Sequence, residues 1–383
     1  MSQPYEIKWG ILATGGIAAT FTKDLLLNPS TRDVSDVKHS VVAAASSTSA
    51  DRAQQFLRDC QAPSSAAAYG TYAELAADEN VDIIYVATPH SHHFQNTMLC
   101  LNAGKHVLCE KAFTVNAQQA RILVDTAREK GLFLMEAVWT RYFPLSIQIR
   151  NMVSEGKIGT VHRVIADNSF GEDIAKNWGN ESRMVNMDLA GGSMLDLGIY
   201  SLTWVFQILY HLQPASSRKA PKVTSSIAPY PPTGADMLTS IICTFPAAPP
   251  ATSPAPSHGV ALTNFLVATD PDGQGTAGAS IRIQGTAGEI QVFGPAYRPR
   301  RYRVIGREKG DVRDVECEIP GQGMFWEADE AARCVRDGKK ESETLGWEES
   351  VVMMECMDEV RRQNGMVYPE AIESTVYKGD GNL

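Results

Sequence analysis

Short β-branched and apolar runs alternate with amphipathic stretches along the first third of the chain. The apolar runs predict strands, and the stretches between them have the spacing of helices with one buried face. The expected strands are 7–13, 40–45, 81–87, 107–109 and 131–136, and the expected helices are 17–27, 49–58, 92–103 and 116–130. This β-α-β-α order predicts a doubly wound parallel sheet that carries helices on both faces.

The remainder of the chain has a different pattern, in which strand-like runs follow one another without regular helices between them. These runs predict one larger, mostly antiparallel open sheet in a C-terminal α+β domain. The expected strands are 161–167, 240–245, 263–268, 279–283 and 289–293, and the expected helices are 144–155, 325–337, 348–363 and one that begins after Gly191-Gly192. We expect two domains, 1–140 and 141–383, and we expect the Pro-rich segment 247–259 to form an exposed loop.

Composition narrows the class of protein. The 383 residues are 44% hydrophobic and 21% charged, which is typical of a globular chain of two domains. The net charge of −9, with dispersed basic residues, argues against a nucleic-acid surface. The seven cysteines form no Cys-x-x-Cys pair, and we expect reduced thiols in a cytoplasmic protein. We see neither an apolar signal core nor a run long enough to span a membrane.

A glycine-containing turn follows the first expected strand and leads directly into a helix. A dinucleotide-binding turn needs glycines where the backbone approaches pyrophosphate, and a helix N-terminus that faces the phosphates. The pattern here is Ala13-Thr14-Gly15-Gly16-Ile17-Ala18, so alanine stands at the first and last glycine positions of the usual fingerprint. An ordinary strand-to-helix turn is the alternative. The residues expected at the dinucleotide are Gly10, Thr14, Gly15, Gly16 and Ile17.

The end of the second strand bears on the choice of nucleotide. An NAD enzyme usually has an acidic residue there for the ribose hydroxyls, but this chain has Ser46-Ser47-Thr48 and, one helical turn later, Arg52. Hydroxyls and a guanidinium suit a 2′-phosphate, and we therefore expect NADP, with Ser46, Ser47 and Arg52 as ligands. The alternative is that Arg52 is a solvated helix residue.

Charged and polar residues stand at the ends of two buried runs. Val107-Leu108-Cys109 ends in Glu110-Lys111, and the preceding strand ends in Thr88-Pro89-His90. In doubly wound sheets ligands bind beyond the carboxyl ends of the strands, so these residues belong at the cofactor cleft. We expect Lys111 to reach both the nicotinamide and a substrate hydroxyl. A salt bridge on the surface at a strand end is the alternative.

A second group of candidate residues lies in GGSMLDLGIY, residues 191–200. Flexible glycines and an N-cap Ser193 begin a helix on which Asp196 and Tyr200 share one face. A tyrosine hydroxyl has an ordinary pKa of about 10, so it serves as a base near neutrality only beside a positive charge. Lys111 is a candidate for that charge, and Asp196 could hold the sugar or the lysine. Tyr200 as a core aromatic is the alternative.

These motifs together resemble the glucose-fructose oxidoreductase / inositol dehydrogenase family. The resemblance covers nearly the whole chain, through WGILATGGIA, ATPHSHH, AGKHVLCEKAFTVNAQQA, EAVWTRYFP and AGGSMLDLGIY. Within the family the chain resembles the dimeric dihydrodiol dehydrogenase branch, and most of all the NADP-dependent D-xylose 1-dehydrogenases of fungi. Ala112 departs from the family, which usually has proline after the lysine.

The resemblance implies an N-terminal NADP-binding Rossmann domain and a C-terminal domain for substrate binding and dimerisation. It also implies that Lys111 is the catalytic lysine and that Tyr200 transfers the proton. It points to His90 and His93 near the cofactor, and to Trp139 and Phe170 as walls of the substrate pocket. A homodimer is the expected assembly, since the open sheet of this family is often a dimer interface.

The leading hypothesis is NADP-dependent oxidation of an aldose, best D-xylose, at C1 to the aldono-1,5-lactone by hydride transfer. Asp196 and Arg141 would orient sugar hydroxyls, although Arg141 could instead lie at a subunit interface. Oxidation of a trans-dihydrodiol by the same residues and a non-catalytic NADP-binding sensor are the rivals. No metal is expected, because the histidines at 90, 92 and 93 have no acidic or thiol ligand beside them.

Overall fold

The chain folds into two compact units. A computed structural model describes residues 3–247, 255–379 and 381. The first unit contains Met1–Trp139, Ile319–Val351 and Glu370–Leu383, and the second contains Thr140–Glu318 and Val352–Pro369. A single division at residue 140 therefore does not describe the units, because two later segments pack with the first.

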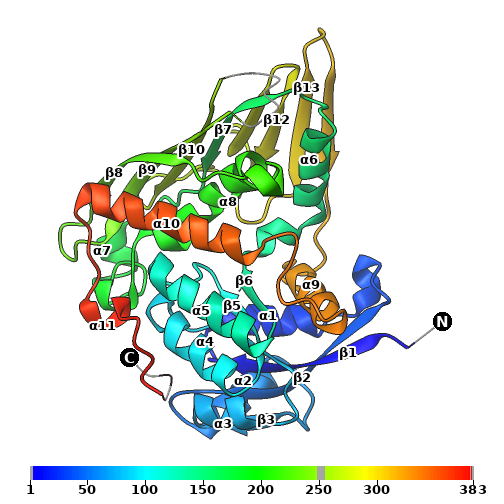
Figure 1. The fold of residues 1–383 in the computed structure, drawn as a ribbon, viewed down its shortest axis with the longest axis vertical. Helices are drawn as coiled ribbons and strands as arrows, with labels where there is room; N and C mark the ends of the chain where they lie inside the picture. The colour runs from blue at the N-terminus through cyan, green and yellow to red at the C-terminus, as the bar shows by residue number, and fades with distance from the viewer. Residues whose placement is uncertain (1–2, 248–254, 380, 382–383) are drawn as a thin grey trace. The chain divides into compact units, whose positions relative to one another are not determined.

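A six-stranded parallel sheet forms the centre of the first unit, in the order β3-β2-β1-β4-β5-β6 (Figure 1). The order reverses between β1 and β4, which is where doubly wound sheets bind dinucleotides. The sequence analysis missed β3, which has only three residues. The strands are β1 (Tyr5–Leu12), β2 (Val37–Ala45), β3 (Ala67–Tyr69), β4 (Ile83–Val86), β5 (His106–Glu110) and β6 (Leu134–Ala137).

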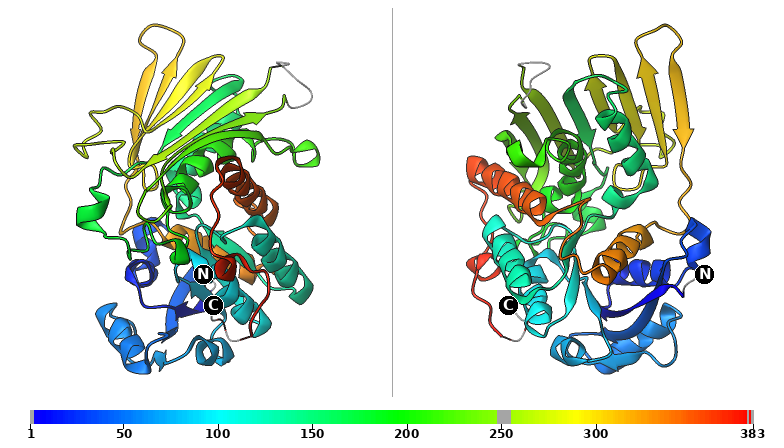
Figure 2. Two further views of the ribbon diagram at one scale, coloured as in Figure 1. Left: turned by 90° about the vertical axis from the view of Figure 1, so that its left-hand side faces the viewer. Right: turned by 45° about the vertical axis from the view of Figure 1, so that its right-hand side comes forward.

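Helices pack on this sheet, and one of them comes from the later part of the chain. Helices α1 and α9 pack against each other and against β1 and β2, whereas α4 packs on β4 and β5 beside α3 and α5 (Figures 1 and 2). Asp24 fixes α9, since its carboxylate accepts the backbone N–H groups of Gln322 (3.0 Å) and Met324 (2.8 Å). The helices are α1 (Gly16–Leu25), α2 (Ala50–Asp59), α3 (Tyr72–Ala77), α4 (His93–Asn102), α5 (Ala117–Lys130), α9 (Phe325–Arg336) and α11 (Glu370–Glu373).

The second unit is built on an eight-stranded sheet in the order β14-β13-β12-β11-β7-β10-β9-β8. Only the β7–β10 pair is parallel, so the mostly antiparallel sheet is confirmed. The strand expected at 263–268 was wrong by several residues, and β8, β13 and β14 were missed. The strands are β7 (Val161–Asp167), β8 (Lys222–Pro229), β9 (Asp236–Phe245), β10 (Ser257–Asn264), β11 (Ile281–Gly285), β12 (Gly288–Phe293), β13 (Arg301–Gly306) and β14 (Val312–Glu316).

Helices cover one face of this sheet and leave the other open (Figure 2). Along β9, Ile241 and Cys243 are buried while Ile242 between them is 44% exposed. Helix α8 lies so close to β10 that a Cβ atom on Gly259 would stand 2.2 Å from Val205. The helices are α6 (Pro144–Ser154), α7 (Ile174–Asn177), α8 (Ile199–Leu209) and the greater part of α10 (Trp347–Asn364), which begins in the first unit.

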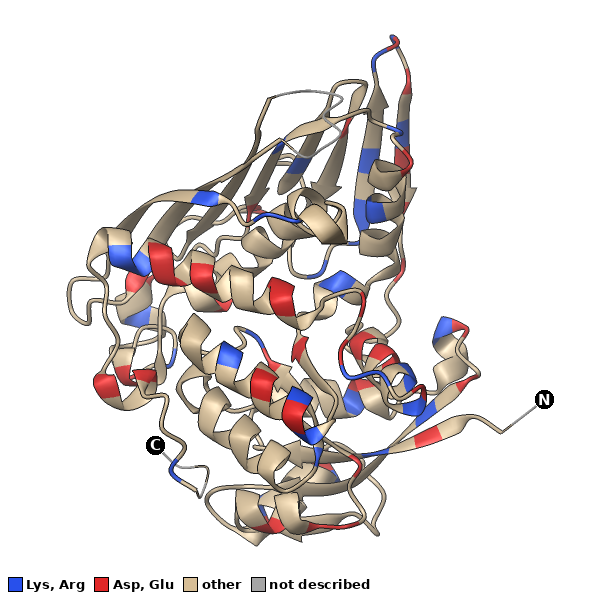
Figure 3. Cartoon of the chain, viewed as in Figure 1, with Lys and Arg blue, Asp and Glu red and all other residues tan. Residues whose placement is uncertain are grey.

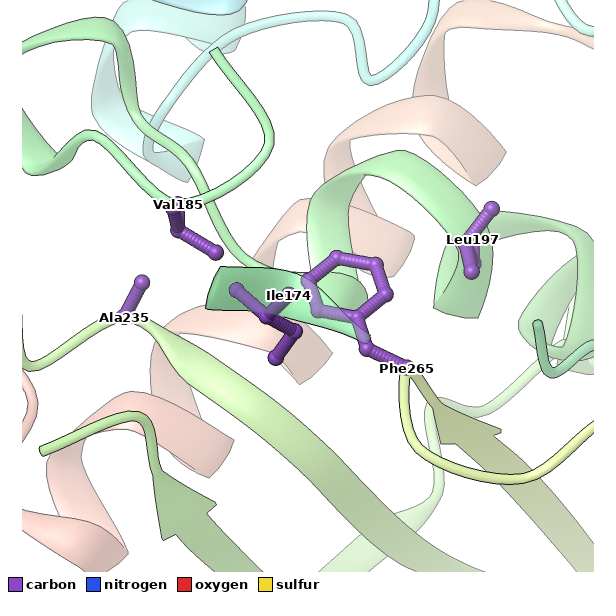
Figure 4. Packing of buried hydrophobic residues seen from close by; sticks show 5 residues of the cluster. All are labelled: Ile174, Val185, Leu197, Ala235 and Phe265. Atoms are coloured by element: carbon purple, nitrogen blue, oxygen red, sulfur yellow. The ribbon is translucent and has the colours of Figure 1, made fainter. Parts of the chain in front are cut away.

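A small hydrophobic cluster lies beneath the loops at one end of this sheet (Figure 4). Its apolar side chains join α7, the residue before β9 and the helical turn before α8, and they exclude water from this part of the unit. Phe170, Trp178 and Tyr230 pack against it. Its members are Ile174, Val185, Leu197, Ala235 and Phe265.

The Pro-rich segment expected to be a loop lies partly outside the described residues, which exclude 248–254. Residues 257–259 belong instead to β10, because Ser257 and His258 pair with β9. Acidic and basic residues are spread over both units, with acidic ones recurring along α10 (Figure 3). All seven cysteines are free thiols, and no helix among the described residues is long and apolar enough to cross a membrane.

Candidate active site

Lys111 follows the last residue of β5, and the carboxylate before it is buried. Glu110 is 5% exposed and accepts the hydroxyl of Tyr85 on β4. Its other oxygen accepts the backbone N–H of Lys111 at 3.1 Å. Tyr85 in turn stacks on Phe21 of α1, with ring centroids 3.8 Å apart. Glu110 therefore lies inside the fold and not on the surface, and it helps to shape the turn that carries the lysine.

His93 joins the ends of β4 and β5. It is fully buried, and its Nδ1 and Nε2 atoms lie 2.8 Å from the carbonyl oxygen of Ala112 and 2.9 Å from that of Thr88. Burial lowers the pKa of His93 to about 4 and outweighs the two carbonyl acceptors. A neutral imidazole donates from one nitrogen only, so one of these carbonyls accepts its N–H. His90 packs edge-on against His93, with ring centroids 5.6 Å apart.

The end of β4 supplies further candidate residues. Thr88 is buried, and its Oγ1 accepts a hydrogen bond from Asn96 of α4 at 3.2 Å. Pro89 is exposed and precedes the short 3₁₀ helix His90–His92. Among the described residues no group of three His, Cys, Asp or Glu side chains could hold a metal ion.

The glycine turn after β1 has the form that a phosphate group requires. Ala13 takes a positive φ of 89°, the conformation for which the fingerprint usually has glycine. A Cβ atom on Gly15 or Gly16 would meet nothing within 4 Å, so the folded chain itself does not demand glycine there. Because glycine has no side chain, the N-terminus of α1 is open to a ligand, and this open helix N-terminus suits a pyrophosphate.

Gly10 and Ile17, the other two residues expected at the dinucleotide, lie on either side of this turn. Gly10 is inside β1, where an added Cβ would stand 3.0 Å from both Leu75 and Val81. Packing therefore explains this glycine without a ligand. Ile17 is 40% exposed in the first turn of α1.

Arg52 is tied to the glycine turn. Its Nε donates to Thr14 Oγ1 at 3.3 Å, which joins the first turn of α2 to the glycine turn before α1. Ser46 is buried, whereas Ser47 is exposed beside it. Ser49 caps α2 by accepting the backbone N–H of Arg52 at 3.2 Å. The guanidinium therefore lies beside the turn through its bond to Thr14, while Ser49 holds the backbone of the same residue.

Asp196 and Tyr200 belong to the second unit and are both largely buried. Asp196 lies in a π-helical turn, Met194–Gly198, that continues directly into α8, where Tyr200 is the second residue. π-Helical turns are rare in proteins, and many of those that occur lie at functional sites. Arg183 Nη1 lies 3.3 Å from Asp196 Oδ1, and its side chain is 57% exposed.

Ser193 lies at the N-cap position of this turn, as expected, but it does not cap the turn with its own side chain. The Ser193 side chain makes no capping hydrogen bond to its own helix. Its Oγ donates instead to Asp236 of β9 at 2.8 Å, and Asp236 also accepts the backbone N–H of Met194 at 2.7 Å. The cap is therefore supplied from a distant strand, which no local pattern could reveal.

An aromatic side chain lies beside Tyr200 within its unit. Tyr297 lies between two of the expected residues, with ring centroids 5.8 Å from Tyr200 and 6.2 Å from Phe170. The sequence analysis missed Tyr297, Arg183 and Asp236, because only the fold brings these residues to the helix. Arg141 is fully buried in this unit and its carbonyl accepts Arg150 Nη1 at 2.9 Å, while Trp139, 8% exposed, ends the first segment of the other unit.

The chain is similar in sequence to known oxidoreductases. Residues 7–138 match the family described as "Oxidoreductase family, NAD-binding Rossmann fold". The D-xylose 1-dehydrogenase (NADP(+)) of Hypocrea jecorina is 57% identical, over 98% of this chain and 96% of that protein. The trans-1,2-dihydrobenzene-1,2-diol dehydrogenase of Sus scrofa is 34% identical, over 95% of this chain and 98% of that protein.

A solved structure shares the fold. KijD10, a 3-ketoreductase from Actinomadura kijaniata crystallised with NADP and TDP-benzene, superposes with a TM-score of 0.72. The alignment covers 93% of this chain and 97% of that one at 21% identity. This likeness bears on the architecture of both sheets and not on substrate.

Proposed function

This chain belongs to the oxidoreductase family of glucose-fructose oxidoreductase and inositol dehydrogenase, and on that premise we propose that it oxidises an aldose at C1 with NADP⁺. D-xylose is the favoured substrate, and the product is the aldono-1,5-lactone. The observation that carries this proposal is the identity, over nearly the whole length of both chains, with an NADP⁺-dependent D-xylose 1-dehydrogenase.

The residues present in the first unit fit NADP. Thr14, Gly15 and Gly16 leave an open helix N-terminus for the pyrophosphate, and Arg52 with Ser46 and Ser47 suits a 2′-phosphate. When bound, NADP⁺ accepts the hydride that leaves C1 of the sugar. We assign Thr88, Pro89, His90, His93 and Glu110 to the same site because they end the strands beside the switch point.

Proton transfer falls to Tyr200 in this proposal. The phenolate takes the proton from the C1 hydroxyl as the C1–H bond breaks, so that a C1 carbonyl forms and the electron pair leaves as hydride. A positive charge makes a phenol a better base near neutrality, and Lys111 is assigned that role. The reaction needs both residues to act on the same hydroxyl.

Asp196 is assigned to sugar hydroxyls. Its partner Arg183 is more than half exposed, so a sugar hydroxyl could replace that contact at little cost. Phe170 and Trp139 offer flat apolar surfaces that suit a sugar face, with Tyr297 beside Phe170. Arg141 is the other residue proposed to orient hydroxyls.

Oxidation of a trans-dihydrodiol is the second candidate. Two observations favour it: the likeness to a mammalian dihydrodiol dehydrogenase and the aromatic rings of Phe170 and Tyr297. Both reactions remove a hydride and a hydroxyl proton from one carbon, so the same residues serve either substrate.

The test is the initial rate of NADPH formation with D-xylose, D-glucose and a trans-dihydrodiol in parallel. Tyr200→Phe should lower turnover by roughly 10²- to 10⁴-fold, as the loss of a general base does. Tyr302→Phe is the matched control, since it removes a buried hydroxyl that bonds Gln148 within the same unit. Turnover of the diol alone would refute the sugar assignment. NADPH binding without any turnover would favour a sensor.

We also propose a homodimer formed through the open face of the eight-stranded sheet, with a second copy of this chain as the occupant. That face carries the exposed side chain of Ile242 and two ion pairs, Arg282–Glu289 and Arg303–Asp314. Because the face presents both positive and negative side chains, two copies can be complementary. Sedimentation of the wild type and of Ile242→Arg tests this. A wild-type monomer, or a variant dimer as stable as the wild type, would refute it.

The cytoplasm is the proposed location. Seven free thiols in a chain without disulfides support a reducing compartment. Fractionation of cells of the source organism, with an antibody to this protein, tests the assignment. Recovery in a secreted fraction would refute it.

A further inference from the structure

The carboxylate of Asp236 holds the start of the helix that carries Asp196 and Tyr200. Asp236 is fully buried, and its Oδ2 accepts hydrogen bonds from Ser193 Oγ (2.8 Å), the backbone N–H of Met194 (2.7 Å) and Thr239 Oγ1 (2.8 Å). We propose that Asp236 is a positioning residue for the dehydrogenase reaction, and that it sets the position of the turn that holds Asp196, at the start of the helix that carries Tyr200. The inference rests on the proposed function.

The glycine pair before the helix is built around the same carboxylate. Gly192 has a φ of 137°, and an added Cβ would stand 2.0 Å from Asp236 Oδ1. Gly191 is equally confined, because its Cβ would lie 2.7 Å from the backbone nitrogen of Asn186. Gly192 therefore lets the carboxylate approach the chain, Gly191 packs against the backbone near Asn186, and neither glycine is a flexible hinge.

Further anchors follow at intervals along the helix. Asn168 Nδ2 donates to the carbonyl of Leu197 at 3.2 Å, and Ser201 Oγ donates to the carbonyl of Leu262 on β10 at 2.8 Å. Tyr200 lies between these two contacts, whereas Asp196 lies between Asp236 and Asn168. Loss of the Asp236 contact therefore frees the turn that holds Asp196 while the later contacts keep α8 on the sheet.

The ionised form of Asp236 is the one that accepts three donors at one oxygen. Burial raises its pKa to about 6, while the three donors act in the opposite direction, so the group is a carboxylate near neutrality. Charge-assisted hydrogen bonds in a dry interior are stronger and hold their geometry better than neutral ones. This makes Asp236 suited to fixing a helix start to within the tolerance that catalysis needs.

Four variants separate positioning from general stability. Asp236→Ala removes the acceptor, Asp236→Asn retains an oxygen of the same shape, and Ser193→Ala removes one donor from the helix start. Thr239→Val is the matched control, since its hydroxyl also bonds Oδ2 but comes from β9 itself. For each we would measure kcat and KM for D-xylose with NADP⁺, the Kd for NADPH, and amide hydrogen exchange across residues 193–201.

We expect Asp236→Ala to lower kcat by about 10²-fold with an unchanged Kd for NADPH. Exchange should quicken within 193–201 and not elsewhere in the unit. Asp236→Asn should restore most of kcat, Ser193→Ala should lose about tenfold, and Thr239→Val should stay near the wild type. If Asp236→Ala does not fold, the kcat and the hydrogen exchange of Ser193→Ala test the positioning role.

Two results would overturn the positioning role. One is wild-type kcat in Ser193→Ala and Asp236→Ala. The other is a loss of activity that only follows the fraction unfolded, with exchange quickened throughout the second unit. A wild type that turns over none of the substrates would refute the proposed function instead, and exchange confined to 193–201 would still show the anchor.

Discussion

The Nδ1 atom of His93 lies 2.8 Å from the carbonyl oxygen of Ala112, the residue that follows Lys111. The same ring reaches the carbonyl of Thr88 at 2.9 Å, so one side chain spans the ends of β4 and β5. The Lys111–Ala112 peptide bond, within this turn, is cis. His93 thus supports the loop that carries Lys111 by contacting its backbone at Ala112.

Replacing His93 by leucine should therefore impair both stability and activity. One buried carbonyl loses its donor, which costs about 1–3 kcal/mol in the free energy of unfolding. The loop that holds Lys111 loosens, and kcat/KM should fall by at least about tenfold. Urea unfolding and steady-state kinetics measure the two effects. His92→Leu is the control, since His92 is less buried and bonds only its neighbour Ser91 among the contacts described here. Equal losses in both variants would contradict the special role of His93.

Stability should also fall on mild acidification. The pKa of His93 is about 4 in the folded chain, against 6.5 when the residue is unperturbed, so the unfolded state binds more protons between these values. Its contribution is fully present above pH 6.5 and is lost as the pH falls toward 4, by roughly 2–4 kcal/mol in total. Urea unfolding of the wild type and of His93→Leu at several pH values measures the difference. A variant that loses stability as steeply as the wild type would assign the effect to other groups.

The choice of NADP over NAD should depend on Arg52. Arg52→Ala removes the guanidinium beside Thr14, and the KM for NADP⁺ should rise by about 10- to 100-fold while that for NAD⁺ changes little. Arg58→Ala serves as the control, because Arg58 is an exposed residue of the same helix whose guanidinium bonds Gln55. A parallel rise for both cofactors would mean that Arg52 supports the turn and does not recognise the 2′-phosphate.

Removal of a buried ion pair should destabilise the first unit strongly. Asp329 of α9 receives two hydrogen bonds from Arg32, each 2.8 Å long, and the side chains of both residues are almost fully buried. Asp329 also contacts His39 Nε2 at 2.8 Å. Asp329→Ala therefore removes a buried partner of both Arg32 and His39, and it should lower the free energy of unfolding by about 3–5 kcal/mol.

Thermal unfolding measures this loss. Asp337→Ala is the control, because Asp337 pairs with Arg336 in an exposed position near the end of the same helix, where such pairs contribute about 1 kcal/mol or less. Similar melting temperatures for the two variants would show that the Arg32–Asp329 pair does not stabilise the fold.

The strand ends of the first unit could be predicted because parallel strands impose a rule on local sequence. Buried runs such as 83–87 and 107–109 consist almost wholly of apolar and aromatic residues, and the polar residues that follow them lie at the same edge of the sheet. Glu110, Thr88 and the glycine turn were therefore found from order and periodicity alone. Boundaries were less certain in the second unit, where the strand expected at 263–268 is β10 at Ser257–Asn264, which begins inside the Pro-rich segment 247–259 that was expected to be a loop.

Sequence by itself determined which residues carry the candidate chemistry: the lysine after a buried strand, and an aspartate and a tyrosine four residues apart. Only the tertiary structure decided how those residues are held. Asp236 accepts the backbone N–H of Met194, 42 residues earlier in the chain, at the start of a helix that Ser193 was expected to cap, and α9 returns to the first sheet from the far end of the chain. Periodicity reports the face of an element that will be buried, but not the partner that covers it, because a hydrogen bond or a packing contact depends on distance in space and not along the chain.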